Sequence, residues 1–253
     1  MILRRFSKHV TDQNWFAVWL DIVVVVVGIF LGMQVTEWNE RRKEAIQEDE
    51  FLHRFVVDIE KHIGLMKAKM DRLKVIYEEE LYILNYLQSN ISEKHSNGRL
   101  ITAIYNSTSV FPYYVYNVTY DELLNSGKFN IIDSVKKRDA ISIFYKDASR
   151  LDEIWNIDIE NQYRLAVRAI IEPEIQKVIL DKCEIRNKKE IEIQKNCEIE
   201  YDETELLRMI DSFSKIENIE NLLRLNLTRT NIAINALNHN TEESKDLLEV
   251  LTN

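Results

Sequence analysis

The hydrophobic pattern of this chain begins with one long apolar run near its N-terminus. Between Trp15 and Val35 the only charged residue is Asp21. About 20 apolar residues in a helix are enough to cross the roughly 30 Å hydrocarbon core of a bilayer. The run therefore predicts a transmembrane helix over residues 15–38, preceded by a basic tail over residues 1–14.

A cleavable signal peptide is the competing interpretation, because basic residues precede the run. A signal core usually holds about 7 to 15 apolar residues and ends in a small-x-small cleavage site. Here the run is longer and leads into a polar, charged segment at 36–43. We therefore expect a retained anchor in the lipid bilayer. Its expected interfacial residues, in the layer that tryptophan and basic side chains favour, are Trp15, Trp19, Trp38, Arg41, Arg42 and Lys43.

Three residues of the run fall on one face of this helix. Gly28 follows Asp21 by seven residues and Gly32 follows Gly28 by four, so all three project from the same side. Small residues at this spacing let a second helix approach closely, and an acid inside a membrane needs a partner. The face predicts self-association into a homo-oligomer. The alternative is a shallow, hydrated Asp21 beside incidental glycines.

The orientation in the membrane is weakly specified. Three Lys or Arg residues precede the span and four follow it within about 20 residues, so the positive-inside rule gives little direction. Cys183 and Cys197 are the only cysteines. A disulfide between them would suit an oxidising compartment, and two reduced thiols are the alternative. We expect the N-terminus in the cytoplasm and the soluble domain outside it.

The most regular helical pattern follows the anchor. Apolar residues alternate in steps of four and three along a predicted stalk helix over residues 39–90. This seam consists of Leu52, Val56, Ile59, Ile63, Met66, Met70, Leu73 and Tyr77. No proline interrupts it, so one helix is predicted from Trp15 to about Leu87. The flanking positions lack the alternating charges of a zipper, which favours packing against later helices over a coiled coil between copies.

Residues 91–253 are predicted to form a helical bundle, so the fold class is all-α, with the stalk packed in an elongated bundle. The whole chain has only five glycines and two prolines, which favours long helices. We expect one helix from 134 to 172, an exposed hairpin or loosely helical excursion at 181–202, a helix over 216–237, and a last helix capped by Thr241. A short helix near 119–127 is expected from the capping-box spacing of Thr119 and Glu122, and Asp133 is expected to cap the helix that follows. Asp202 is expected to start another short helix.

An aromatic loop near residues 110–120 is the one segment without a helical pattern. Pro112 disfavours a helix there, and the β-branched and aromatic residues suit an extended strip. An aromatic strip either binds a membrane or periplasmic protein partner, or crosses the bundle as part of its core. The candidate partner-binding residues are Phe111, Tyr113, Tyr114 and Tyr116.

Three segments give the chain a resemblance to a family. Val27 to Lys43, Thr119 to Gly127 and the pair Phe144-Tyr145 resemble a family of N-terminally anchored bacterial membrane proteins of unassigned activity. Asp21 stands where a glutamate is typical of that family, and the C-terminal third is unmatched. The resemblance implies a single-pass protein of the bacterial inner membrane, and it supplies no catalytic residue.

Signatures of catalysis and of cofactor binding are absent from the sequence. There is no Gly-rich phosphate loop, no nucleophile elbow and no Cys-x-x-Cys pair. Glu50 and His53 form a single Glu-x-x-His, whereas a di-iron bundle needs two. The net charge of −9 argues against a nucleic-acid partner, which would require a basic stripe. We expect no enzyme activity, no metal and no cofactor.

Two functions fit these features. The first is a membrane-anchored, self-associating interaction or scaffold protein. The alternative is a subunit of a multi-protein membrane machine in which Asp21 relays protons or ions, since intramembrane acids often mark such pathways.

Overall fold

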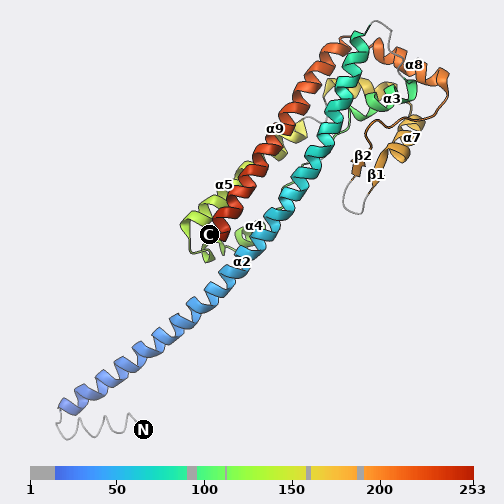
Figure 1. Ribbon diagram of the computed structural model, residues 1–253. Helices are drawn as coiled ribbons and strands as arrows, with labels where there is room; N and C mark the ends of the chain where they lie inside the picture. Colours follow the sequence, from blue (N-terminus) through green and yellow to red (C-terminus); the bar gives the residue numbers. More distant parts are fainter. Residues whose placement is uncertain (1–14, 90–95, 112, 158–160, 187–190) are drawn as a thin grey trace.

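The computed structural model describes residues 15–89, 96–111, 113–157, 161–186 and 191–253, so the tail predicted over 1–14 lies outside the described residues. The fold is all-α with one small hairpin, as predicted. Its elements are α2 (Trp15–Gln88), α3 (Asn97–Asn106), α4 (Val118–Asn125), η1 (Phe129–Ile131), α5 (Val135–Ile157), α6 (Gln162–Ile170), α7 (Pro173–Cys183), β1 (Glu184–Arg186), β2 (Ile191–Ile193), α8 (Glu203–Ser214) and α9 (Ile219–Thr252) (Figure 1).

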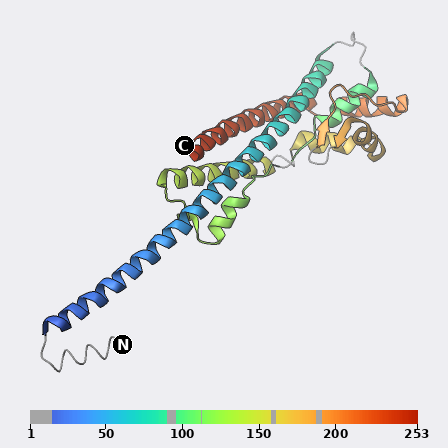
Figure 2. The same cartoon turned by 60° about the horizontal axis from the view of Figure 1, so that its bottom comes forward.

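Helix α2 is the spine of the molecule. It runs without a break for 74 residues, which is about 110 Å at 1.5 Å per residue. It contains no proline, and its glycines weaken a helix without removing a backbone donor. Its first part extends alone, and its second part lies beside α9 (Figures 1 and 2). The predicted continuous helix is confirmed.

The buried face of α2 is broader than the predicted seam. Four seam residues are buried as expected: Ile59, Met66, Met70 and Leu73. The four positions that flank the seam on one side are buried as well: Phe55, His62, Lys69 and Ile76. The reason is that α2 packs against α9 and also against α3 and α4, so more than one narrow stripe is covered. The seam therefore packs within the chain, as the lack of zipper charges favoured.

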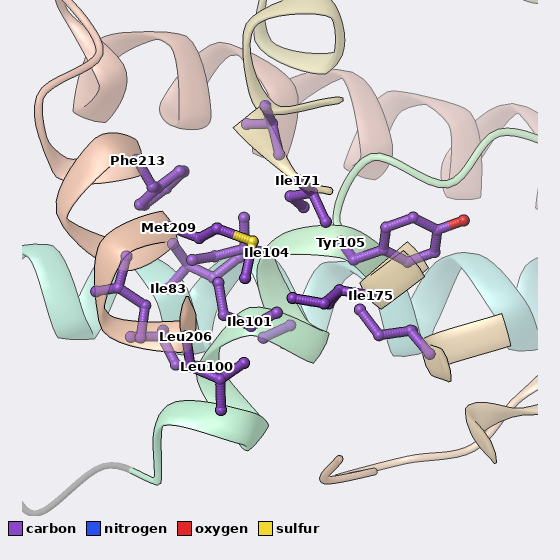
Figure 3. Packing of buried hydrophobic residues seen from close by; sticks show 14 of the residues in the cluster. Ile83, Leu100, Ile101, Ile104, Tyr105, Ile171, Ile175, Leu206, Met209 and Phe213 are labelled. Atoms are coloured by element: carbon purple, nitrogen blue, oxygen red, sulfur yellow. The ribbon is translucent and has the colours of Figure 1, made fainter. Parts of the chain in front are cut away.

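Three hydrophobic clusters follow one another along α2. The proximal cluster includes Phe55, Ile59, Leu123, Phe144, Tyr145 and Leu247. The middle cluster includes Met66, Met70, Leu73, Ile76, Tyr113 and Leu237. The distal cluster joins Ile83 to α3, α6, α7 and α8 through residues such as Leu100, Ile104, Ile175, Met209 and Phe213 (Figure 3). One helix thus contributes to every core of the domain.

The two C-terminal helices predicted over 216–237 and after Thr241 are a single helix, α9. That prediction is wrong because polar side chains here bond within the helix instead of capping a new one. Thr241 Oγ1 donates to the carbonyl of Leu237 at 2.7 Å, and Ser244 Oγ donates to that of Asn240 at 2.7 Å. Such bonds to the preceding turn satisfy a hydroxyl in mid-helix.

The single helix predicted from 134 to 172 is also wrong. Helix α5 ends at Ile157, and α6 starts only after Asn161, whose Oδ1 accepts a hydrogen bond from the Arg164 amide at 2.8 Å. This bond is an N-cap, which satisfies a donor of the first turn. Pro173 then opens α7 at a position where proline is tolerated, because a first-turn amide has no partner within the helix.

The 181–202 excursion contains a hairpin, which was one of the two structures predicted for it. Strands β1 and β2 pair antiparallel, and a disulfide joins Cys183 to Cys197 with their Cα atoms 5.7 Å apart. The structure thus adopts the bonded alternative for these cysteines. Both lie within the distal cluster and are buried, so the base of the excursion is core, in contrast to its predicted exposure.

The short helix α4 ends as predicted and begins differently. Gly127 has a φ of +67°, its amide donates to Leu124, and the next amide, of Lys128, donates to Leu123. This pattern is a Schellman cap, for which glycine is preferred. The predicted capping box of Thr119 and Glu122 is absent, because both side chains bind α2 instead.

The cap of α5 also differs from its prediction. The hydroxyl of Ser134, and not the carboxylate of Asp133, accepts a hydrogen bond from the Lys137 amide. The helix beginning after Asp202 is capped as predicted, since that carboxylate accepts the amides of Thr204 and Glu205 at 3.0 Å.

Candidate functional site

The first candidate site is the apolar segment at the start of α2. It is long and apolar enough to cross a membrane, and only 6% of its most apolar window is buried against the rest of the chain. Trp15, Trp19 and Trp38 are all exposed. Between the first two and the third, α2 rises about 28 to 35 Å, close to a hydrocarbon thickness. Beyond them Arg41 forms an exposed ion pair with Glu37 at 3.6 Å.

The small-residue face of this segment is open. A Cβ placed on Gly28 or Gly32 would meet nothing within 4 Å, and Asp21, two turns earlier on the same face, is half-buried. Thr36 Oγ1 donates to the Gly32 carbonyl at 3.0 Å, which satisfies that hydroxyl within the helix. At its two glycines, the face predicted to pack against a partner helix is thus uncovered by the described residues of this chain.

The aromatic loop crosses α2 as part of the core. Tyr113 is buried, and Phe111 is half-buried beside it. Lys69 on α2 donates from Nζ to the Phe111 carbonyl at 2.8 Å and lies 5.3 Å from the centre of the Tyr113 ring. These contacts match the crossover interpretation of the loop. Phe111 and Tyr113 are therefore packed residues, and their predicted role in binding a partner stays a prediction.

The two remaining tyrosines of the loop lie nearer the surface. Tyr114 is 55% exposed. Tyr116 accepts a hydrogen bond from Lys61 Nζ at 3.2 Å, and its ring lies 4.9 Å below the same ammonium group. Of the four candidate partner-binding residues, only Tyr114 presents most of its surface to solvent.

The second candidate site is a polar layer between α2 and α9 that sequence reasoning missed. Glu80 is completely buried, and its Oε1 accepts hydrogen bonds from Asn226 Nδ2 at 2.6 Å and Thr230 Oγ1 at 2.8 Å. Burial raises the pKa of Glu80 to about 8, against the weaker lowering effect of these two donors. At neutral pH the carboxyl is therefore mostly protonated.

Asn226 connects this layer to the end of α3. Its Nδ2 also donates to the Ser107 carbonyl at 3.1 Å, and its Oδ1 accepts from Asn161 Nδ2 at 3.2 Å. Ser107 Oγ lies 2.7 Å from the hydroxyl of Tyr163. Burial raises the pKa of the Tyr163 hydroxyl, so this group stays neutral. Four elements that are distant in sequence meet in these few bonds.

Two arginines of α6 secure the turn after α3. Arg164 donates to the Thr108 carbonyl, and Arg168 Nε donates to the Thr108 hydroxyl at 2.6 Å. The Arg168 guanidinium also lies 3.7 Å from the centre of the Tyr105 ring. Each arginine has defined partners, so the pair positions the turn.

A second buried polar pair lies between α2 and α9, closer than Glu80 to the N-terminus of α2. His62 and Asn240 are both buried, with His62 Nε2 at 2.8 Å from Asn240 Oδ1. Burial lowers the pKa of His62, because a charged imidazole would lose its hydration there. The imidazole ring also lies perpendicular to the ring of Phe144, with 5.6 Å between their centroids. His62 is therefore a neutral core residue.

Glu50 and His53, the pair considered for a metal site, are both exposed on α2. Among the described residues no group of three His, Cys, Asp or Glu side chains is placed to hold an ion. His53 is exposed on α2, and His239 pairs with Glu243 at 3.3 Å on the surface of α9.

The comparisons with known proteins add no further constraint. No family model, no curated protein and no solved structure matches this chain.

Proposed function

We propose that this chain is a membrane-anchored interaction or scaffold protein that self-associates through its apolar helix and holds a helical domain away from the bilayer. The observation that carries the proposal is the continuity of α2. The same helix supplies the uncovered apolar segment and a face of all three hydrophobic clusters. A stiff connection of this kind fixes the distance between membrane and domain.

The proposed location is the bacterial inner membrane, with the N-terminus in the cytoplasm and the domain in the periplasm. The Cys183–Cys197 disulfide supports the periplasmic side, because disulfides persist in oxidising compartments and are rare in the cytosol. The proposed bacterial origin rests on the resemblance of the anchor, of Thr119–Gly127 and of Phe144-Tyr145 to anchored bacterial membrane proteins.

The proposed contact between copies is the face that carries Asp21, Gly28 and Gly32. Without a Cβ at either glycine, two backbones can approach closely, and van der Waals packing then drives association. A second acid on the facing helix would let two protonated Asp21 carboxyls bond to each other, which removes the energy cost of an unpaired acid in hydrocarbon.

Cysteine crosslinking tests this contact. Both native cysteines are bonded, so an introduced cysteine is the only thiol. At 100° per residue Val25 lies on the glycine face and Val23 lies on the opposite face. In bacterial membranes Val25→Cys should form an oxidised dimer of the full chain, and the matched variant Val23→Cys should not. Adding Gly28→Leu to Val25→Cys should reduce the dimer about tenfold.

Equal crosslinking at Val25→Cys and Val23→Cys would contradict the proposed face. Asp21→Asn separates the scaffold from the relay alternative. A scaffold keeps its crosslinked dimer with the amide, since an amide pair also forms hydrogen bonds. Loss of a membrane-potential-dependent phenotype in Asp21→Asn, with the dimer intact, would favour the relay.

Thiol labelling in intact cells tests the orientation. Without reductant, a membrane-impermeant maleimide should leave Cys183 and Cys197 unlabelled. After a membrane-impermeant phosphine reductant, both should be labelled if the domain is periplasmic. Ser7→Cys is the control, because a cytoplasmic N-terminus reacts only in permeabilised cells. Labelling of Ser7→Cys in intact cells would reverse the proposed orientation.

A further inference from the structure

The end of the domain nearest the apolar segment is the connection between α4 and α5, which we call the basal turn (residues 126–139) (Figure 1). Helix α4 runs back along α2 towards the apolar segment, starting from the contact of Thr119 with Asp58. The backbone amide of Asp133 then donates to Glu48 Oε1 at 2.8 Å. Helix α5 leads away again, from the proximal cluster to the middle one.

The basal turn lies close to the expected membrane surface. Glu48 follows Trp38, an expected interfacial residue, by ten residues of one helix, which is a rise of about 15 Å. Arg41, only three residues beyond Trp38, lines a cavity together with Lys128 and Asn130 of the turn. Membrane helices tilt by about 20° on average, and a tilt towards the turn brings it closer to the lipid.

The basal turn is basic in an acidic chain, whose net charge is −9. Its charged residues are Lys128, Lys136, Lys137, Arg138, Asp133 and Asp139. Lys137 and Arg138 donate hydrogen bonds to backbone carbonyls, so their positive charges remain. Lys128 and Lys136 are exposed. Glu122 does not neutralise Lys128, because Arg54 is its bonded partner and the main cause of its lowered pKa, with Lys128 the weakest.

The composition of this end favours a surface contact over a bound free anion. Glu44 and Glu48 line the cavity between α2 and the turn, so the cavity itself repels anions. The outer side of the turn instead combines the exposed lysines with Val135, which is 59% exposed beside Lys136. Anionic lipid headgroups attract basic residues near the membrane, and an apolar side chain among them suits the interface.

We propose that the basal turn contacts anionic lipid headgroups, with Lys128 and Lys136 beside the phosphates and Val135 at the interface. The inference rests on the proposed membrane anchor. The contact fixes the direction in which α2 tilts. It therefore also fixes where the distal cluster points, since Ile83 lies about 68 Å along the same helix from Trp38.

A fluorescent label tests the contact in the full chain held in lipid nanodiscs. Both native cysteines are bonded, so Val135→Cys provides the only thiol. The thiol carries a nitrobenzoxadiazole dye, whose emission rises and shifts to the blue in an apolar environment. The nanodiscs contain phosphatidylcholine alone or a mixture with anionic phosphatidylglycerol. The Val135→Cys label should shift to the blue only in the anionic nanodiscs.

Charge variants test whether the lysines hold the turn on the lipid. Each basic residue near an anionic surface contributes about fivefold, so Lys128→Gln with Lys136→Gln should lower the ratio of docked to free label about 25-fold. Lys67→Gln with Lys74→Gln makes the same change in net charge at exposed positions of α2 more than about 40 Å beyond Trp38, and should leave the ratio unchanged.

Salt provides an independent test of the same contact. Raising the salt concentration from 0.1 M to 1 M shortens the Debye length from about 10 Å to about 3 Å and should release the label. Ile143→Cys is the matched position control, because it is 61% exposed on the same helix and eight residues further from the turn. Its label should give the same emission in both lipids.

A label at Ile29→Cys, inside the apolar segment, separates failure of the contact from failure of the anchor. If the Ile29→Cys label is in water, the proposed anchor is wrong. If it is in lipid while the Val135→Cys label does not respond to anionic lipid, only the contact is overturned. A Val135→Cys shift of equal size in both lipids would assign the surface to a second copy and overturn the lipid contact. An equal shift at Ile143→Cys would overturn the position of the surface.

Discussion

At the scale of single residues, Glu80 makes the stability of the domain depend on pH. Its pKa is about 8 in the folded chain and near 4.5 when unfolded, so the folded state holds the proton over this interval. The contribution of Glu80 to stability is therefore greatest below pH 4.5, falls as the pH rises through the interval, and stays low above pH 8. His62 acts with the opposite sign, because its lowered pKa removes stability as the pH falls below about 6.5.

Replacing Glu80 with glutamine should remove the loss of unfolding free energy at alkaline pH. Glutamine keeps an oxygen for Asn226 and Thr230 and carries no charge at any pH. From pH 6 to pH 9 the wild-type domain should lose about 3 kcal/mol of unfolding free energy through this residue, and Glu80→Gln should not. Urea unfolding at both pH values measures the difference.

The neighbouring Glu78 provides the control for that experiment. It is exposed and pairs with Lys195 at 3.0 Å, so Glu78→Gln should change the unfolding free energy by less than about 1 kcal/mol at either pH. A Glu80→Gln variant with the same loss between pH 6 and pH 9 as wild type would contradict the buried, protonated carboxyl.

Residue roles of this kind could not be predicted from the sequence. Glu80 is the last of three consecutive glutamates, which together resemble part of a solvated face, and its partners Asn226 and Thr230 are 146 and 150 residues away. Thr119 has the spacing of a capping box, yet its hydroxyl donates to the carboxylate of Asp58 on another helix instead of capping its own. Local spacing predicts local bonds, and these bonds are made only when the chain is folded.

At the scale of elements, α4 contacts α2 through a buried hydrogen bond and an exposed ion pair, and these two contacts should differ in their contribution to stability. Asp58 is buried, and its carboxylate accepts hydrogen bonds from the Thr119 hydroxyl at 2.6 Å and from the Thr119 backbone amide at 3.0 Å. Thr119→Val should cost about 1 to 3 kcal/mol, because it leaves a buried carboxylate with one donor fewer. Chemical denaturation of the full chain measures this loss.

The exposed pair between Arg54 and Glu122, on the same two helices, is the comparison. Glu122→Gln should cost less than about 1 kcal/mol, since solvent screens this pair. Similar losses in Thr119→Val and Glu122→Gln would refute the assignment of Asp58 as the main polar anchor of α4.

Two glycines in different backbone conformations give a matched test of the helix assignments. Gly64 lies in mid-helix on an exposed face, and a Cβ there would meet nothing within 4 Å. Gly64→Ala should therefore stabilise the domain by about 1 kcal/mol. Gly127 has a positive φ, so Gly127→Ala should destabilise it by about 1 kcal/mol. Thermal melts that shift in the same direction for both variants would contradict one of these assignments.

The success of element prediction followed the strength of the local signal. α2 was predictable because nothing in 74 residues interrupts its pattern. α9 was predicted as two helices because Asn238 to Thr241 read as a break, whereas bonding to the preceding turn and the packing of Asn240 on His62 keep the helix continuous. Tertiary contacts overrode a capping preference there.

At the scale of the whole molecule, the separate clusters along α2 suggest that the domain is not one cooperative block. The distal cluster contains both cysteines and most of α3, α6, α7 and α8, whereas the proximal cluster contains α4 and part of α5. Regions with separate cores open with separate free energies. The disulfide should therefore stabilise the distal end and leave the proximal end nearly unchanged.

Replacing both cysteines with serine tests this division. The bond closes a loop of about 15 residues, so its loss should lower the stability of the distal region by about 3 kcal/mol, chiefly through the entropy of the unfolded chain. Hydrogen exchange should quicken in α7, α8 and the hairpin, while α4 and the first turns of α5 keep their protection. The variant Cys183→Ala with Cys197→Ala controls for burying two hydroxyls and should show the same spatial pattern. Faster exchange along the whole length of α9 and in α4 would mean that the clusters unfold together, and the stiff spine would then unite them into one cooperative unit.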